Sequence, residues 1–391
     1  MTRQHRDILL ALSFAVALSA LSLRITDAQL PLFASRFSAS LTEVSWVVTA
    51  YGLAYGLALP VLGTLGDRLG KIRCIAMSCC AAALASTACA GAWSLPLLVA
   101  ARAACGVAMA SIVPMAMAWI GDEFDYQVRQ PVLARFLIGQ IAGMSLGVGL
   151  GGVTADYLSP ATTFLVIACG FAVIGLWLLR VSWRQGIDRK PAAAGPLFAG
   201  MRAGVLGVLA ERQARFILMV AALEGACLFG VIAFTATHFH QALGVSLSSA
   251  GGMVMLLGAG GLVYAMRSGF FVRRLGERGM AYAGGALMAG SIALMAWSPW
   301  WSLSLLACLA CGLGYYMMHN TLQTRATQMS TVHRSAAMSL YSCCFFMGQA
   351  AGVACFGLAQ RHMPMAVAMS LCAVALAVLS LCFGRRLGSR P

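Results

Sequence analysis

The chain has 391 residues, of which 60% are hydrophobic and only 10% are charged, and its mean hydropathy is +0.83. Soluble domains are about 45 to 50% apolar and about 25% charged, so this composition excludes a soluble globular domain and predicts a protein that lies mostly in lipid. The net charge of +15 does not indicate a partner nucleic acid, because no soluble basic module remains outside the apolar segments.

Apolar segments that are long enough to cross about 30 Å of hydrocarbon as helices follow one another along the chain. They lack the alternation over about 10 residues that the strands of a membrane barrel require. The sequence therefore predicts an all-α integral membrane protein with twelve transmembrane helices. The predicted spans are 8–33, 43–66, 72–93, 95–121, 132–154, 160–182, 214–238, 246–270, 279–298, 300–323, 334–359 and 363–384.

Basic residues are distributed unequally over the loops between these spans. Arg36 and Arg361 fall in loops of one side, whereas the other Lys and Arg residues outside the spans fall on the side of the two termini. Cytoplasmic loops carry such an excess. We therefore expect a multi-pass protein of the cell membrane, in the bacterial inner membrane, with both termini in the cytoplasm. The polar segment 183–213 is then a cytoplasmic linker between two six-helix bundles, 1–182 and 214–391.

The first predicted helix contains two charged residues, Arg24 and Asp27, and the fourth and seventh contain Arg102 and Glu224. A charge inside a span is costly, so each of these residues is a candidate functional residue. A carboxylate beside an arginine can couple transport to protons, since the ion pair keeps the acid ionised until substrate or a rearrangement disrupts it. The alternative is a static pair that only neutralises buried charge. We expect Asp27 to carry the proton, with Glu224 as its competitor.

Two internal matches indicate that the chain is duplicated. Residues 63–73, Gly-Thr-Leu-Gly-Asp-Arg-Leu-Gly-Lys-Ile-Arg, follow the second span, and a degraded copy begins 206 residues later at Gly269. Gly-Gln-Ile-Ala-Gly at 139–143 recurs as Gly-Gln-Ala-Ala-Gly at 348–352, an offset of 209 residues. Halves repeated in parallel, with a substrate site between them near the midplane, are found in transporters.

The segment 63–73 has the composition of a gate at the cytoplasmic surface. Its glycines let helix ends approach closely, and Asp67 can lie against the positive N-terminus of a helix, which we expect to be that at Arg334. Arg68 is then expected near the acidic end of the fourth helix. The alternative is a basic turn that only sets topology. The predicted gate residues are Gly63, Asp67, Arg68, Gly70, Lys71, Arg73, Asp122 and Glu123.

Small and polar residues inside the later spans suggest a packing face and a cavity. Four glycines of the fifth span can form a face for close helix packing, and they are Gly143, Gly147, Gly151 and Gly152. Polar and aromatic side chains could line a substrate cavity, although an interhelical hydrogen bond is the alternative for each. These candidates are Gln140, Tyr264, Tyr315, Tyr316, His319, Asn320 and Gln349.

Several of these segments resemble signatures of the major facilitator superfamily. Residues 63–73 are similar to its loop between helices 2 and 3, and the acidic residue before Leu30 and Pro31 resembles helix 1 of its drug:proton antiporter branch. Arg102 resembles the arginine of the helix 4 motif Arg-x-x-Gln-Gly, which is associated with proton transfer, with Cys105 where Gln is usual. The glycines of the fifth span resemble the antiporter signature, with Val148 in place of its proline. The resemblance implies the twelve-helix fold of that superfamily.

The predicted function is secondary active transport, in which a small organic solute, a drug or a metabolite, is exported by proton antiport through alternating access. The alternatives are a proton-coupled symporter that imports a small solute, including an anionic one because of Arg24 and Arg102, and a membrane sensor without transport. Motifs of hydrolases, ATP-driven pumps and zinc proteases are absent from the sequence, so we expect neither an enzyme nor a cofactor or metal site. The expected partners are the solute, protons and membrane lipid, and we expect a monomer.

Overall fold

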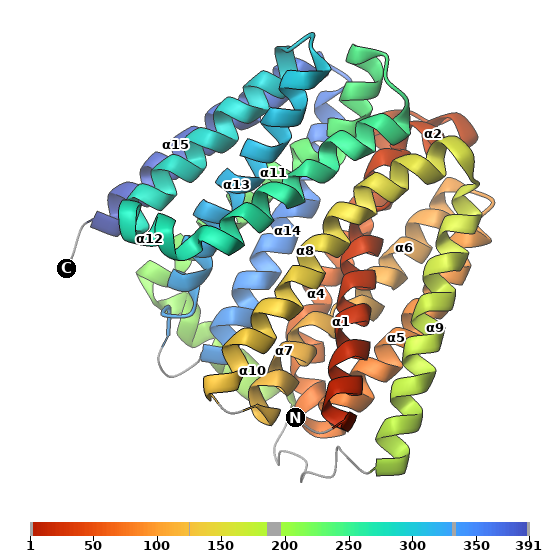
Figure 1. Cartoon of the computed structure of the whole chain (residues 1–391), viewed down its shortest axis with the longest axis vertical. Coiled ribbons are helices and arrows are strands. Elements are labelled where there is room, and N and C mark those ends of the chain that lie inside the picture. Colours follow the sequence, from red (N-terminus) through yellow and green to blue (C-terminus); the bar gives the residue numbers. More distant parts are fainter. Residues whose placement is uncertain (1–2, 125, 186–196, 331–333, 389–391) are drawn as a thin grey trace.

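The computed structural model of the protein describes the backbone of residues 3–124, 126–185, 197–330 and 334–388. Side chains are described for the same residues except 3–4, 63–68, 126–131, 134–135, 184–185, 197–201, 334–335 and 388. Within these ranges the chain consists of helices joined by short turns, and it contains no β-strand (Figure 1).

An N-terminal group of helices lies on the right of Figure 1. Within this group α4 packs on α6, α5 on α9 and α1 on α8. Its elements are α1 (Arg3–Arg24), the 3₁₀ helix η1 (Asp27–Gln29), α2 (Leu30–Arg36), α3 (Leu41–Val44), α4 (Trp46–Leu69), α5 (Lys71–Ala90), α6 (Leu95–Met109), α7 (Ile112–Glu123), α8 (Tyr126–Tyr157) and α9 (Pro160–Gln185).

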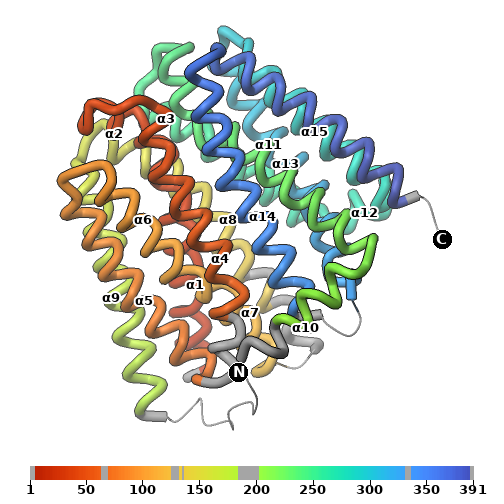
Figure 2. The backbone as a smooth tube through the Cα atoms, turned by 180° about the vertical axis from the view of Figure 1, so that it is seen from behind, coloured from red at the N-terminus to blue at the C-terminus, as the bar shows by residue number. Residues whose placement is uncertain are grey.

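A C-terminal group lies on the left of the same view, and it meets the N-terminal group where α12 packs on α8 and α14 packs on α4. The segment that joins the groups contains a helix, α10, which the sequence did not predict; Figure 2 shows it crossing below α14. The elements are α10 (Leu197–Ala210), α11 (Arg212–Leu243), α12 (Leu247–Trp297), α13 (Trp301–Ala326), α14 (Arg334–Ala359) and α15 (Met365–Gly388).

Eleven helical segments of the described residues are long and apolar enough to cross a membrane. One of them, α12, has 51 residues, and a straight helix of that length would measure about 76 Å, more than twice the hydrocarbon thickness of about 30 Å. It is interrupted at Gly276, which has the non-helical angles φ 62° and ψ 177°. Figure 1 shows α12 as two segments that run in opposite directions from this point.

Two of the predicted helices are interrupted, each about four residues before a proline. The first span is divided into α1, η1 and α2, and the interruption includes Asp27, four residues before Pro31. The fourth span is divided into α6 and α7 at Ala110, four residues before Pro114. Proline lacks an N–H group and its ring clashes with the carbonyl four residues earlier, which accounts for both interruptions. The first one places Asp27 in the 3₁₀ turn η1 inside a span, close to the end of α1 at Arg24.

The second internal match of the sequence is reproduced as a packing contact. A Cβ atom on Gly143 of α8 would lie 2.2 Å from the carbonyl oxygen of Ala17 in α1. A Cβ atom on Gly352 of α14 would lie 2.1 Å from the carbonyl oxygen of Ala226 in α11. Both residues of the second pair lie 209 residues after their counterparts. Each glycine therefore allows two helix backbones to approach more closely than any other residue would.

The internal match between residues 63–73 and the copy that begins at Gly269 is reproduced in the backbone. Gly70 between α4 and α5 has φ 93°, Gly276 inside α12 has φ 62°, and they lie 206 residues apart. Only glycine adopts such angles without strain. The N-caps of α3 and α12, Ser40 and Ser246, are separated by the same 206 residues.

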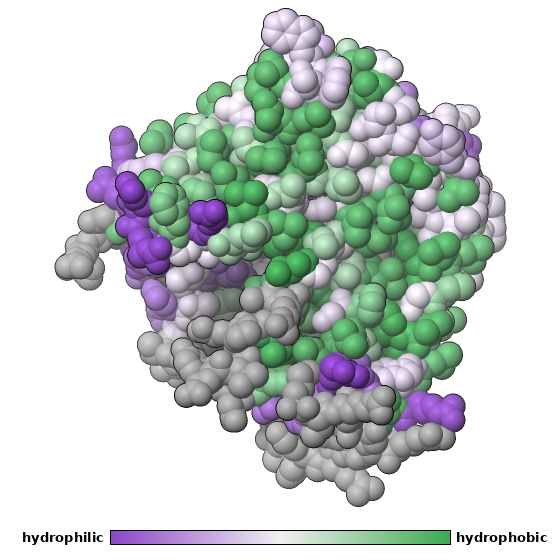
Figure 3. Space-filling view, in the orientation of Figure 1, coloured by the Kyte–Doolittle hydropathy of each residue, from purple (hydrophilic) through white to green (hydrophobic). Residues whose placement is uncertain are grey.

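The surface has an apolar middle and two different ends. Figure 3 shows apolar residues across the centre of the face that it presents, with hydrophilic residues at its left and lower edges. We call the end of the bundle with Lys71, Arg212, Arg273 and Arg325 the basic end. The opposite end carries exposed tryptophans, which in membrane proteins lie at the interface with water. They are Trp46, Trp93, Trp297, Trp300 and Trp301.

Candidate functional site

A cavity of about 1000 Å³ lies between the two groups of helices. Residues of α1, α4, α7 and α8 line one side, and residues of α11, α13 and α14 line the other. The wall is mainly apolar and aromatic, and includes Tyr55, Phe229 and Phe345. Lys71 and Val205 of α10 also line the cavity, so it extends to the basic end. We call it the main cavity.

Two contacts join the groups at the opposite end. A carboxylate oxygen of Asp156, at the end of α8, accepts a hydrogen bond of 2.7 Å from the backbone N–H of Ser248 and another from its hydroxyl. The Thr42 hydroxyl donates to the carbonyl oxygen of Gly357 over 2.6 Å. Thr42 and Ser248 are 206 residues apart, as are the N-caps that precede them, so equivalent positions of the repeat take part in both contacts, although their partners, Gly357 and Asp156, are not equivalent. They close the opposite end of the main cavity.

Arg24 and Asp27 form a buried ion pair at the interruption of the first span. Nη1 of Arg24 lies 3.2 Å from a carboxylate oxygen of Asp27, and the two side chains are 3% and 0% exposed. Nη2 of Arg24 donates to the side-chain oxygen of Gln349 over 3.0 Å, which joins the two groups of helices. The guanidinium also stacks on Phe229, 4.1 Å from the ring centroid. The first span therefore contains a carboxylate paired with an arginine, the arrangement that the sequence analysis considered for proton coupling or for static charge neutralisation.

Arg102 is fully buried near this pair, but its described contacts include no carboxylate. Its guanidinium donates to the carbonyl oxygen of Ser22 over 3.1 Å and to the Thr26 hydroxyl over 3.4 Å. It lies 4.4 Å from the centroid of the Tyr51 ring. The three charges of this region therefore sum to one positive charge. Arg102 thus contacts the last turn of α1 and the start of the interruption in the first span.

A second buried pair joins Glu224 of α11 to His319 of α13. Nδ1 of His319 lies 2.7 Å from one carboxylate oxygen of Glu224, and Glu224 is completely buried. His319 is 14% exposed and lines the main cavity, where it packs against the rings of Tyr315 and Phe345 at 4.9 and 4.7 Å between centroids. The histidine therefore separates the carboxylate from the cavity. Its pairing with Glu224 was not predicted, because no sequence signal joins residues 95 positions apart.

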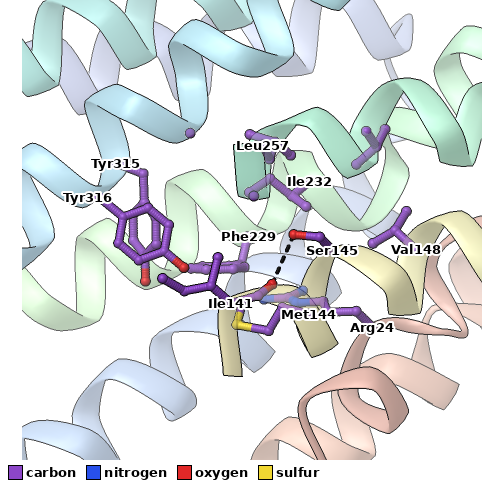
Figure 4. A pocket seen from close by; sticks show the side chains of 13 residues that line it. Arg24, Ile141, Met144, Ser145, Val148, Phe229, Ile232, Leu257, Tyr315 and Tyr316 are labelled. Atoms are coloured by element: carbon purple, nitrogen blue, oxygen red, sulfur yellow. Dashed lines mark hydrogen bonds between the residues drawn. The ribbon is translucent and has the colours of Figure 1, made fainter. Parts of the chain in front are cut away.

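A smaller cavity of about 50 Å³ adjoins the main one, since Met144, Phe229 and Tyr315 line both. Figure 4 shows this cavity between α8, α11, α12 and α13, with apolar side chains on most sides and the guanidinium of Arg24 beneath the Phe229 ring. Tyr316 completes one wall. The arginine is the only charged residue among the described residues that line it.

The structure divides the predicted cavity residues into two sets. Gln140, Tyr315, His319 and Gln349 line the main cavity, and Tyr316 lines the smaller one. Tyr264 and Asn320 lie outside both linings, and the Asn320 amide donates to the Tyr264 hydroxyl over 2.7 Å. For these two, the alternative of an interhelical hydrogen bond describes the geometry.

The predicted packing glycines lie on two faces of α8. Cβ atoms on Gly147 and Gly151 would lie 2.6 and 2.2 Å from carbonyl oxygens of the first span, as for Gly143. A Cβ atom on Gly152 would lie 2.2 Å from the carbonyl oxygen of Leu247 in α12. The helix therefore packs closely both within its own group and across the interface. A role of these contacts in transport stays a prediction.

The predicted gate is described only in part, since the side chains of Gly63, Asp67 and Arg68 lie outside the described residues. Lys71 forms an ion pair with Asp122, and His5 lies 2.7 Å from Glu123. Both acidic residues that were expected to meet Arg68 therefore have other partners. Gly70 has the positive φ expected of it, and Arg73 lies in the first turn of α5.

Comparison with known families identifies this arrangement. The family model of the Major Facilitator Superfamily matches residues 12–353. The chain belongs to the major facilitator superfamily. The fold is similar to that of a solved structure, a bacterial homolog of the human lysosomal transporter Spinster in an inward-facing and unoccupied conformation. The TM-score is 0.78, the match covers 98% of this chain and 97% of that chain, and the sequences are 15% identical.

Among curated relatives, the multidrug export protein EmrB of Escherichia coli is 26% identical over 206 residues, 52% of this chain and 40% of the relative. The multidrug efflux pump LfrA of Mycolicibacterium smegmatis is 34% identical over 159 residues, 40% of this chain and 32% of the relative. The chain thus spans less than half of the length of these relatives. The chain is thus a multi-pass membrane protein of the major facilitator superfamily.

Proposed function

We propose that this transporter exports a small organic solute by proton antiport through alternating access. The observation that carries the proposal is the Glu224–His319 pair in the wall of the main cavity. The names of the relatives, which are export and efflux proteins, support the direction of transport. The mainly apolar wall of the cavity suits an organic solute rather than an inorganic ion.

The orientation follows from charge. Cytoplasmic loops of membrane proteins carry an excess of Lys and Arg, so we assign the basic end to the cytoplasm, in the bacterial inner membrane. If α12 is counted as two crossings that turn at Gly276, twelve helices cross the membrane and both termini are cytoplasmic. The main cavity then faces inward, and the contacts of Asp156 and Thr42 close it on the outside. Outward opening requires these contacts to separate, and the gate at 63–73 to close.

We assign proton binding to the Glu224–His319 pair. One carboxylate oxygen of Glu224 has no hydrogen-bond partner among the described residues, so it is free to take a proton. His319 lines the cavity and can pass a proton between water and the carboxylate. Asp27, the residue favoured from the sequence, also has one carboxylate oxygen without a partner among the described residues, and neither carboxylate lines a cavity. Asp27 is paired with an arginine, which stays charged, whereas Glu224 is paired with a histidine that lines the cavity, so we keep Asp27 as the competitor. The proton gradient is the proposed energy source, with no cofactor.

The test uses everted membrane vesicles, in which the cytoplasmic face is outside, and two permanently charged probes, 1-naphthalenesulfonate and trimethyl(1-naphthylmethyl)ammonium. An acidic vesicle lumen should drive accumulation of at least one probe, and vesicles without the protein should show none. Loss of accumulated probe from an acidic lumen would indicate import by symport instead. Absence of gradient-dependent flux for both probes, and for a wider panel of aromatic solutes, would favour a sensor without transport.

A further inference from the structure

Apart from tyrosines, the described ionisable residues that line the two cavities are all basic. Arg24 lines the smaller cavity, and Lys71 and His319 line the main one. Among the described residues of these linings none is Asp or Glu, since Asp27 and Glu224 are completely buried behind them. A solute in either cavity therefore meets positive rather than negative groups.

Arg24 differs from the other two because part of its donor set is unused. Lys71 is paired with Asp122 and His319 with Glu224. Nη1 of Arg24 is paired with Asp27, but Nη2 donates only to the neutral amide of Gln349, and Nε has no hydrogen-bond partner among the described residues. The side chain is only 3% exposed, so this unpaired donor is not compensated by bulk water.

Nε and Nη2 are the two donor nitrogens of Arg24 without an anionic partner. Nε and Nη2 form one edge of the planar guanidinium, and a carboxylate binds such an edge with two parallel hydrogen bonds. A bound carboxylate would displace only the Gln349 amide and leave the Arg24–Asp27 pair intact. Apolar groups surround the guanidinium, with Phe229 stacked on it and Met144 and Leu257 nearby in the same cavity (Figure 4).

We propose that the Nε/Nη2 edge of Arg24 binds the carboxylate of an amphiphilic organic acid, whose apolar part lies against Phe229 and Met144. The proposal names the substrate class of the transport function proposed above and rests on it. Because Gln349 belongs to α14 and Arg24 to α1, binding of the acid also replaces a hydrogen bond that joins the two groups of helices. The ligand would thereby favour their separation.

The experiment measures equilibrium binding to the purified full chain in lipid nanodiscs by isothermal titration calorimetry. The probes share one ring system and differ in charge, and they are 1-naphthoate, 1-naphthalenemethanol and 1-naphthylmethylammonium. We expect 1-naphthoate to bind at least tenfold more tightly than the other two. Arg24→Gln should abolish this difference, and Arg361→Gln, which changes an exposed arginine outside both cavities, should preserve it.

Two variants of Gln349 test the edge itself without removing the arginine. Gln349→Glu places a carboxylate where the ligand would bind, so it should lower the affinity for 1-naphthoate at least tenfold. Gln349→Ala frees the edge, so it should maintain or raise that affinity. Wild-type affinity in Gln349→Glu, or tighter binding of the alcohol or the ammonium by the wild type, would overturn the proposal.

The binding experiment tests the carboxylate site and the vesicle experiment tests the export function, so each proposal can fail while the other stands. If 1-naphthoate binds in an Arg24-dependent manner but no probe is transported, the carboxylate site stands and the export function falls. If only the ammonium probe is transported and 1-naphthoate does not bind, the export function stands and the carboxylate site falls.

Discussion

Replacing Glu224 by glutamine separates proton coupling from folding. Glutamine has the shape of glutamate, so its side-chain oxygen can still accept from Nδ1 of His319, which lies 2.7 Å from the carboxylate in the wild type. A hydrogen bond to a charged group contributes about 1.5 to 3 kcal/mol and a neutral one about 0.5 to 1.5, so the substitution should cost about 1 kcal/mol. That cost is small beside the usual stability of about 5 to 15 kcal/mol, so Glu224→Gln should fold.

The transport cycle should nevertheless be lost, because an amide cannot exchange a proton. In everted vesicles with an acidic lumen, accumulation of the transported probe should fall to the level of vesicles without the protein. Exchange of labelled for unlabelled probe across the vesicle membrane needs no net proton binding, so it should survive. Glu277→Gln is the matched control, since Glu277 pairs with Arg325 at the basic end and lines neither cavity. It should accumulate probe like the wild type.

The reasoning is refuted if Glu224→Gln accumulates probe at the wild-type rate. If Asp27→Asn then loses accumulation and keeps exchange, the proton site lies in the ion pair of the first helix. If both variants behave as the wild type, the carrier is not coupled to protons through either buried carboxylate.

Three further substitutions test the packing and the two gates. Gly143→Ala should lower the thermal unfolding temperature, because overpacking costs about 1 to 3 kcal/mol and the gain in helix propensity is at most about 1 kcal/mol. Gly290→Ala is the control and should raise the unfolding temperature, because no atom lies within 4 Å of the added methyl group. Equal shifts of the two variants would contradict the close packing at Gly143. Asp156→Ala removes two hydrogen bonds to Ser248, so amide hydrogen exchange in the first turn of α12 should accelerate, and unchanged exchange would show that this contact does not close the opposite end. Asp67→Asn should slow transport while expression stays intact, and wild-type turnover would exclude its role in the gate.

The sequence by itself determined the class of protein and its order of spans, because hydropathy and charge act locally. Apolar segments of sufficient length are helical in lipid whatever they pack against, since each backbone polar group must be satisfied within its own segment. The repeat was also visible, and its glycine at 143 returns as a backbone contact at 352. Pro31 favours the interruption at Asp27 but does not by itself determine it, since Pro60 lies inside the continuous helix α4.

Only the tertiary structure decided which buried polar groups meet. Arg24 and Gln349 are 325 residues apart, and their contact depends on how α1 and α14 are rotated and shifted against each other across the interface. The partner of Glu224 was equally open, since several polar residues of the later spans could have faced it. Successive residues of a helix point in directions about 100° apart, since one turn takes about 3.6 residues. A change in the rotation of a helix would therefore exchange one partner for another. The packing of the helices against one another sets that rotation, and it places His319 rather than Asn320 against the carboxylate.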